Sequence, residues 1–175
     1  MVSPLNNVPM RLWLVLSLCV VLVASPIHAE PSASRGKSIY MKANCVGCHK
    51  WHGGGGGSYG GVALSLRATA LSREALILVI RCGRPATNMP YHYRKAYKDD
   101  NRECYGSNSA SLGDATPPRA HHFLSDRDVA AVVDYVQSDI QGRGTPSYDD
   151  CVAFWGVDAR RCKLMAQAES NGEKQ

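Results

Sequence analysis

Cys45-Val46-Gly47-Cys48-His49 is the strongest signal in this chain. If these residues form one turn of helix, Cys45, Cys48 and His49 are related as i, i+3 and i+4 and share one face. The spacing therefore predicts two thiols and one imidazole that point toward a common ligand.

The CxxCH pattern is the attachment signature of c-type haem, in which two thiols bond to the vinyl groups and the imidazole binds iron. Two other chemistries use a CxxC pair. A thioredoxin-type redox pair needs a surrounding βαβ pattern, which is missing, and a zinc site needs a second ligand pair, for which His52 is the near candidate. We therefore predict one covalent haem c on Cys45 and Cys48, with His49 as an axial iron ligand.

The N-terminus has the layout of a secretory signal peptide. Arg11 precedes an apolar run from Leu12 to Ala24, and Ala29 offers a small residue for cleavage. The run is shorter than the roughly 20 residues that span a bilayer, although an uncleaved anchor is the alternative. We expect residues 1–29 to be removed and the mature chain to lie in the periplasm without stable membrane insertion, where its cysteines meet an oxidising environment.

The composition is typical of one globular domain with an appendage. Of 175 residues, 45% are hydrophobic and 20% are charged, which excludes disordered and coiled-coil chains, and the length excludes a multidomain enzyme. Removal of Arg11 with the signal leaves 19 Lys and Arg against 15 Asp and Glu, a net charge of +4. Basic and acidic residues alternate along most of the chain, so no nucleic-acid partner is expected.

Two segments show the pattern of helices that bury one face. In the longer one, Ser125 can cap the N-terminus, and two Asp residues follow it at the positive end of the helix dipole. Its apolar stripe consists of Val129, Val132, Val133, Val136 and Ile140. The other helix is predicted from Ser72, also a candidate cap, through Arg81.

These features resemble the class I cytochrome c family over residues 34–140. The resemblance begins with Gly36-Lys37-Ser38-Ile39-Tyr40, leads into the CxxCH motif and ends with the helix that starts at Ser125. It implies an all-α, loop-rich class I cytochrome c fold, with three to five helices around one covalently bound haem. The corresponding domain spans residues 30–141.

The resemblance also implies two local arrangements. In the family, a Gly and an aromatic residue of the first helix pack against an aromatic residue of the last helix, and here Gly36, Tyr40 and Tyr135 occupy these positions. A backbone carbonyl in the loop after the motif orients the iron-ligating imidazole, here that of His49. This loop reads Gly61-Val62-Ala63-Leu64 and lacks the proline that the family often has.

A methionine is expected as the second axial ligand, because a thioether opposite a histidine raises the reduction potential of the haem. Met89 lies in a segment that resembles the family's helix, Gly turn and Met-Pro element, Arg81-Cys82-Gly83-Arg84-Pro85-Ala86-Thr87-Asn88-Met89-Pro90-Tyr91. In the family this element lies shortly before the last helix, whereas here 35 residues separate Met89 from Ser125. We therefore interpret 91–115 as an insertion and predict Met89 as the ligand, the alternatives being His92, His121 and His122.

Cys19 is expected to leave with the signal peptide, and the four other cysteines outside the motif, Cys82, Cys104, Cys151 and Cys162, allow three disulfide pairings. We predict the local pairing, Cys82 with Cys104 and Cys151 with Cys162, although the sequence does not distinguish it from the other two. The first bridge would clamp the loop around Met89. The second would lie in a C-terminal extension, 142–175, whose apolar residues favour docking onto the core.

Two arginines, Arg67 and Arg84, are candidates to pair with haem propionates. Because lone arginines are more often hydrated surface charges, we expect solvated side chains at both positions.

The function expected from these features is that of a periplasmic electron carrier, not an enzyme. Its partners would be redox proteins, with a periplasmic dehydrogenase as electron donor and an oxidase or another cytochrome as acceptor. One alternative is a haem enzyme or ligand sensor with an open or labile sixth position, whose distal candidates are His52, His92, His121 and His122. Another is a cytochrome subunit held permanently in a periplasmic dehydrogenase complex.

Overall fold

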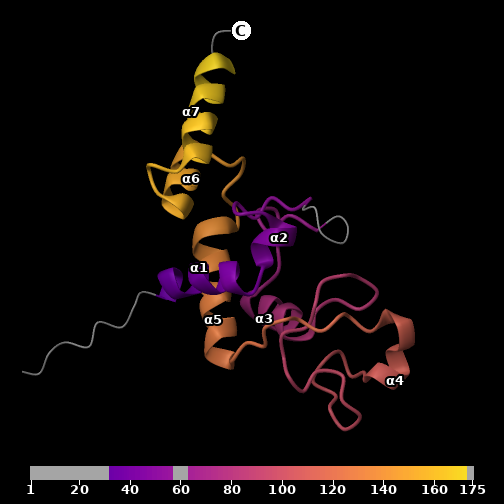
Figure 1. The fold of residues 1–175 in the computed structure, drawn as a ribbon. Helices are drawn as coiled ribbons and strands as arrows, with labels where there is room; N and C mark the ends of the chain where they lie inside the picture. Colours follow the sequence, from indigo (N-terminus) through magenta and orange to yellow (C-terminus); the bar gives the residue numbers. More distant parts are fainter. Residues whose placement is uncertain (1–31, 57–62, 173–175) are drawn as a thin grey trace, which may run out of the picture.

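The computed structural model describes residues 32–56 and 63–172 (Figure 1). The predicted signal peptide, 1–29, lies outside these residues. The described part folds into α-helices joined by loops, with one isolated parallel β-bridge between Tyr91 and Arg119. Its α-helices are α1 (Ser32–Lys42), α2 (Cys45–His49), α3 (Arg73–Cys82), α4 (Ser109–Leu112), α5 (Asp126–Tyr135), α6 (Tyr148–Trp155) and α7 (Arg160–Gly172). The all-α prediction is confirmed, and α1 to α5 lie within the expected domain.

The core forms where α1 crosses α5 (Figure 1). Gly36 lies at the crossing, where a Cβ atom would clash with the Ala131 carbonyl oxygen and lie 2.5 Å from Tyr135 Cβ. The rings of Tyr40 and Tyr135 meet edge to face, with centroids 5.7 Å apart. The predicted packing of Gly36 and Tyr40 against Tyr135 is therefore present.

Replacement of Gly36 by valine is expected to lower the free energy of unfolding by about 3 kcal/mol, because the added carbons must push two packed helices apart. Urea denaturation measures the change. The control is Gly172→Ala in α7, where a Cβ would have nothing within 4 Å, and we expect it to change the free energy of unfolding by under about 1 kcal/mol. Equal losses in both variants would contradict the close helix crossing.

The last core helix begins as the sequence predicts. Ser125 Oγ accepts a hydrogen bond from the Asp128 amide at 3.2 Å, and the Asp128 carboxylate accepts one from the Ser125 amide at 3.4 Å, which completes a capping box. The pKa of Asp128 lies below its ordinary value, mainly because the Ser125 side chain bonds to its carboxylate and to a lesser extent because Arg35 forms an ion pair with it. A π-helical turn, η2 (Val136–Ile140), continues α5, so the predicted apolar stripe is buried to its end at Ile140.

The segment predicted as an insertion leaves the core and returns to it. At its base, the Tyr91 amide donates to Pro118 O at 3.0 Å, and the Ala120 amide donates to Tyr91 O at 3.1 Å. The Leu124 amide then donates to His92 O at 3.0 Å. The chain just after Met89-Pro90 therefore lies beside the residue that precedes Ser125, although more than 30 residues intervene in the sequence.

The predicted insertion, 91–115, packs around a small core that also includes the end of α3. Cys82, Ala96, Tyr97 and Cys104 are all at most 4% exposed. Tyr97 Oη donates to Cys82 O at 2.6 Å, and Cys82 and Cys104 form a disulfide. The loop that follows Met89 is thus held at the end of α3 by a disulfide and by the packing of buried side chains.

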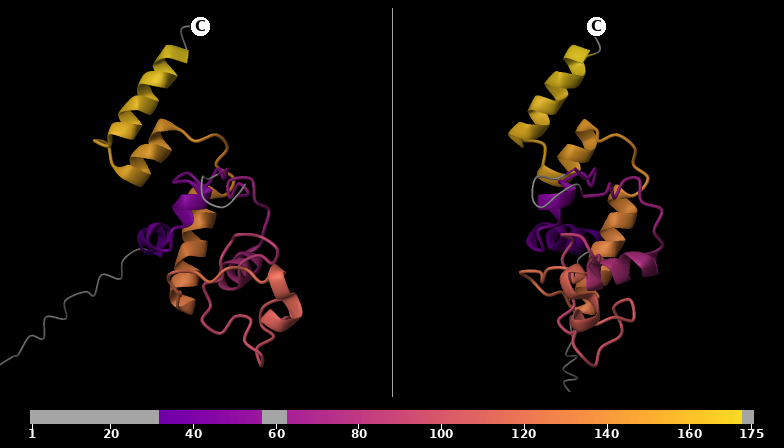
Figure 2. Two further views of the ribbon diagram at one scale, coloured as in Figure 1. Left: turned by 45° about the vertical axis from the view of Figure 1, so that its right-hand side comes forward. Right: turned by 90° about the vertical axis from the view of Figure 1, so that its right-hand side faces the viewer.

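The C-terminal extension forms a helical hairpin of α6 and α7. The disulfide Cys151–Cys162 joins the two helices, which confirms the second predicted pairing as well as the first. Phe154 of α6 packs on Trp51 with ring centroids 6.0 Å apart, whereas α7 projects away from the core (Figure 2). The expected docking of the extension therefore takes place through α6.

Candidate functional site

The CxxCH motif forms a helix of its own. The short helix α2 follows directly on Asn44, whose backbone is left-handed with φ 61°, and its five residues place Cys45, Cys48 and His49 on one turn. At the other end, Tyr40 Oη donates to Lys50 O at 2.8 Å and so ties the end of α2 to α1. Burial raises the pKa of Tyr40, so its hydroxyl remains a donor at neutral pH.

The two motif cysteines are the ones left out of the disulfides. In residues 32–56 and 63–172, the other four cysteines pair with each other, and neither Cys45 nor Cys48 forms a disulfide. Both are half-buried, and burial raises the pKa of Cys45 to about 12. The two cysteines at haem-attachment spacing are therefore not used for disulfides, unlike the other four described cysteines.

His49 is held in the form that binds iron. Its Nδ1 lies 3.0 Å from Leu64 O, and because a carbonyl oxygen only accepts, Nδ1 carries the proton. Burial lowers the pKa of His49, and the bond to Leu64 opposes this effect without reversing it. The imidazole is therefore neutral at pH 7, and the lone pair of Nε2 is available to a metal.

The glycine-rich loop brings the Leu64 carbonyl to His49 without the family's proline. The Gly55 amide donates to His49 O at 3.2 Å, and the Gly56 amide donates to Ala63 O at 2.9 Å. Gly55 has φ 75°, and a Cβ at this position would clash with Ala63 O. Glycine is required here because two backbone segments approach each other closely in a conformation that other residues rarely adopt.

Met89 follows α3 after a tight turn. Gly83, with φ 65°, makes this turn, and a Cβ there would lie 2.6 Å from Met89 O. The Arg84 amide donates to Met89 O at 3.3 Å, and the Met89 amide donates to Thr87 Oγ1 at 3.2 Å. The backbone of Met89 is thus fixed on both sides, and its assignment as the second iron ligand stays a prediction.

The alternative histidines lie in different environments. His92 is 5% exposed, with Nδ1 2.9 Å from His122 O, and burial lowers its pKa. His121 and His122 are exposed. His52 Nδ1 accepts a hydrogen bond from the Gly54 amide at 3.0 Å, and burial, then nearby Lys50, lowers its pKa. His92 and His52 are therefore neutral at pH 7, and each has one ring nitrogen bonded to the backbone.

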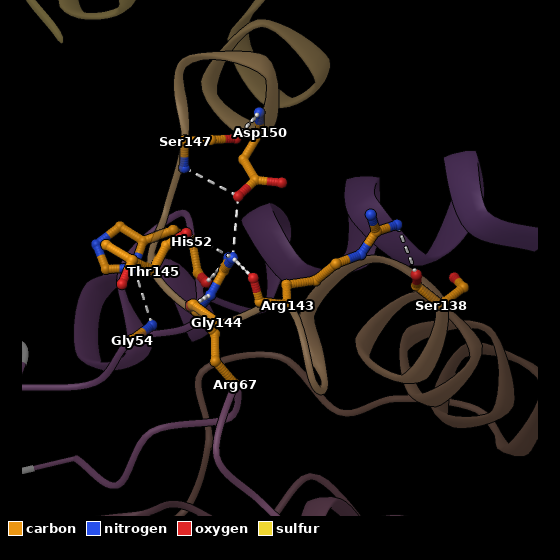
Figure 3. A network of polar contacts seen from close by, with 9 residues as sticks. All are labelled: His52, Gly54, Arg67, Ser138, Arg143, Gly144, Thr145, Ser147 and Asp150. Carbon is orange, nitrogen blue, oxygen red and sulfur yellow. Dashed lines mark hydrogen bonds and ion pairs between the residues drawn. The ribbon is translucent and has the colours of Figure 1, made fainter. Parts of the chain in front are cut away.

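The expectation of a solvated Arg67 is wrong. Arg67 is 7% exposed, because its guanidinium lies among backbone carbonyls and beside Asp150 (Figure 3). Its carbonyl partners are His52, Arg143, Gly144 and Thr145. The Ser147-x-x-Asp150 pattern is a capping box, which a sequence can reveal, but it predicts only the start of α6 and not the pairing of Asp150 with Arg67. Arg84, in contrast, is exposed as expected.

The donor set of α2 fits haem c. Two thiols outside disulfides and one neutral imidazole share a single helical turn, and these are the groups that covalent attachment and axial ligation require. No described helix has the length and apolar character needed to cross a membrane.

Comparison with known proteins gives one family. The family model described as Cytochrome c matches residues 33–139, which is more than half of the chain. No curated protein and no solved structure gives a significant match.

Proposed function

The chain belongs to the cytochrome c family, and from this membership we propose that it is a periplasmic electron carrier. Cys45 and Cys48 would hold one haem c covalently, and His49 and Met89 would bind its iron. The observation that carries the proposal is the hydrogen bond from His49 Nδ1 to Leu64 O, which leaves Nε2 facing away with its lone pair. When bound, the haem supplies one-electron chemistry at its iron.

Neighbouring residues hold both of the proposed iron ligands in place. The Leu64 carbonyl fixes the ring plane and tautomer of His49. The Gly83 turn and the Thr87 hydroxyl fix the backbone of Met89, and the disulfide Cys82–Cys104 closes the loop that follows it. A rigid ligand set favours electron transfer over substrate binding, because neither ligand has to leave the iron.

The periplasmic location is supported by two features. The signal-peptide pattern in residues 1–29 directs export. The disulfides Cys82–Cys104 and Cys151–Cys162 belong to a protein of an oxidising compartment.

The partners proposed are redox proteins of the same compartment. A periplasmic dehydrogenase would donate the electron, and an oxidase or another cytochrome would accept it. Two haem propionates would reduce the net charge of +4 on the mature chain to about +2, which still favours acidic docking faces. Contacts of this class bury under about 1,200 Å² and dissociate quickly, as a carrier requires.

A redox titration of the full-length protein, followed by visible absorption, tests the proposal. We expect one reversible one-electron transition, and we expect the reduced protein to resist carbon monoxide because both axial positions are filled. The same protein unfolded in guanidinium chloride, where the methionine is released, is the positive control and should bind carbon monoxide. Rapid binding to the folded protein would instead support a haem enzyme or ligand sensor with an open position.

A further inference from the structure

Arg67 is a buried cation whose counter-ion comes from the C-terminal extension. Its side chain is 6% exposed, and its Nη2 lies 2.9 Å from a carboxylate oxygen of Asp150. Asp150 is the carboxylate that pairs with Arg67 in the described part of the chain. A buried guanidinium without a partner is strongly destabilising. The cytochrome c domain, matched over residues 33–139, therefore contains a charge that a residue beyond the domain neutralises.

The position of Asp150 is itself fixed. The Ser147 amide donates to the Asp150 carboxylate at 3.1 Å, and the Asp150 amide donates to Ser147 Oγ at 3.1 Å. Burial acts to raise the pKa of Asp150, but the bonds from Ser147 and Arg67 outweigh it, so the pKa lies below its ordinary value. The next residue, Cys151, is bonded to Cys162 of α7. The carboxylate is thus ionised and held from both sides.

Arg67 connects this carboxylate to the surroundings of His49. Arg67 Nη1 donates to His52 O at 3.1 Å, in the segment that follows α2. The Leu66 and Arg67 amides both donate to Gly53 O, at 2.7 and 3.3 Å. Leu64, three residues before Arg67, supplies the carbonyl that receives the His49 Nδ1–H. The Arg67 side chain therefore bonds to the segment after His49 (Figure 3), and the backbone next to Arg67 is the segment that supplies the Leu64 carbonyl.

Helix α6 makes a second, separate contact next to α2. Phe154 packs on Trp51, and Lys37 of α1 lies over the Phe154 ring at 5.1 Å. Lys37 Nζ also donates to Ala153 O at 2.8 Å. The extension thus contacts α1 through Lys37 and the segment after α2 through Trp51.

We propose that the C-terminal extension positions the iron-ligating imidazole, with Asp150 fixing Arg67 and Arg67 fixing the loops that hold His49. The inference rests on the proposed function, because it treats His49 as an axial ligand. Arg67 and Asp150 are positioning residues. Their effect passes through the Nδ1–H hydrogen bond, whose length and direction set the orientation and basicity of the ring.

The test replaces Asp150 by alanine in the full-length haem protein, with Asp149→Ala as the matched control. Asp149 is the exposed neighbour in the same turn of α6, and its carboxylate makes no hydrogen bond or ion pair in the described part of the chain. The readouts are the reduction potential and the proton NMR signals of the His49 ring in the oxidised protein. For Asp150→Ala we expect haem to stay attached, the His49 signals to shift and the potential to change, while Asp149→Ala matches the unchanged protein.

Two further variants keep the proposal falsifiable if Asp150→Ala does not accumulate. Asp150→Asn keeps the volume and one acceptor oxygen and should give an intermediate shift, and Asp150→Glu should restore the unchanged signature. Equal His49 signals and potentials in Asp150 and Asp149 variants would overturn the positioning role and leave the proposed function intact. An unchanged chain without covalent haem would instead overturn the proposed function and this inference with it.

Discussion

A chain in which Cys45 and Cys48 are both replaced by alanine is expected to carry no covalently bound haem. These cysteines provide two thiols at attachment spacing, and the other four described cysteines are bonded to each other. Without the thioether links, haem binding would rest on His49 and its opposite ligand alone. The measurement is haem staining after denaturing electrophoresis, together with the mass of the intact protein, in a host that attaches haem c.

The matched control is the double replacement of Cys151 and Cys162 by alanine. This variant loses a disulfide outside the cytochrome c domain, so we expect haem to stay attached while the free energy of unfolding falls by about 3 kcal/mol. Covalent haem on the variant that lacks Cys45 and Cys48 would refute the proposed attachment site. If haem were lost only from the variant that lacks Cys151 and Cys162, the attachment site would lie in the C-terminal extension.

Replacement of Met89 by alanine is expected to leave the haem attached and to lower the reduction potential on the order of 0.1 V, since axial ligands tune haem potentials over about 0.8 V. The sequence separation of Met89 from the last core helix argued against this assignment, but the structure supports it. The Leu124 amide bonds to His92 O, so the Met-Pro element lies next to the start of α5, as it does in the family. Redox titration and the visible spectrum of the reduced protein measure the effect.

Met165→Ala is the control for this substitution. Met165 lies in α7, which projects away from the core (Figure 2), and its loss should leave the potential and spectrum unchanged. An unchanged potential in the Met89 variant would instead favour His92, His121 or His122 as the second ligand. The buried His92, whose Nδ1 already faces the His122 carbonyl, would be the first of these to replace.

The helices of the core could be read from local signals. The Ser125 capping box, the stripe that ends at Ile140 and the Ser72 cap of α3 all lie where the sequence places them. Helix ends and buried faces depend on residues within a few positions of each other, so a single segment carries the information. The close approach of the helices at Gly36 could be predicted only from the resemblance, because Tyr135, which Gly36 packs against, lies almost a hundred residues away.

The environment of Arg67 could not be read in this way. Nothing in the residues around position 67 distinguishes a solvated arginine from a buried one. Its burial depends on Asp150 and on carbonyls of the connector before α6, which reach it only when the extension folds back. A long-range ion pair of this kind has no spacing rule, and the sequence-based expectation was wrong for that reason.

Local sequence patterns were enough to place two thiols and an imidazole on one helical turn and to locate the starts of α3 and α5. These features follow from spacings within a few residues, where helical geometry leaves little freedom. Three features became known from the folded chain alone: which cysteines pair, that the segment after Met89 returns beside the start of α5, and that the extension neutralises Arg67. Each of these depends on distant segments meeting in space, which is set by the packing of the whole chain and not by any local pattern.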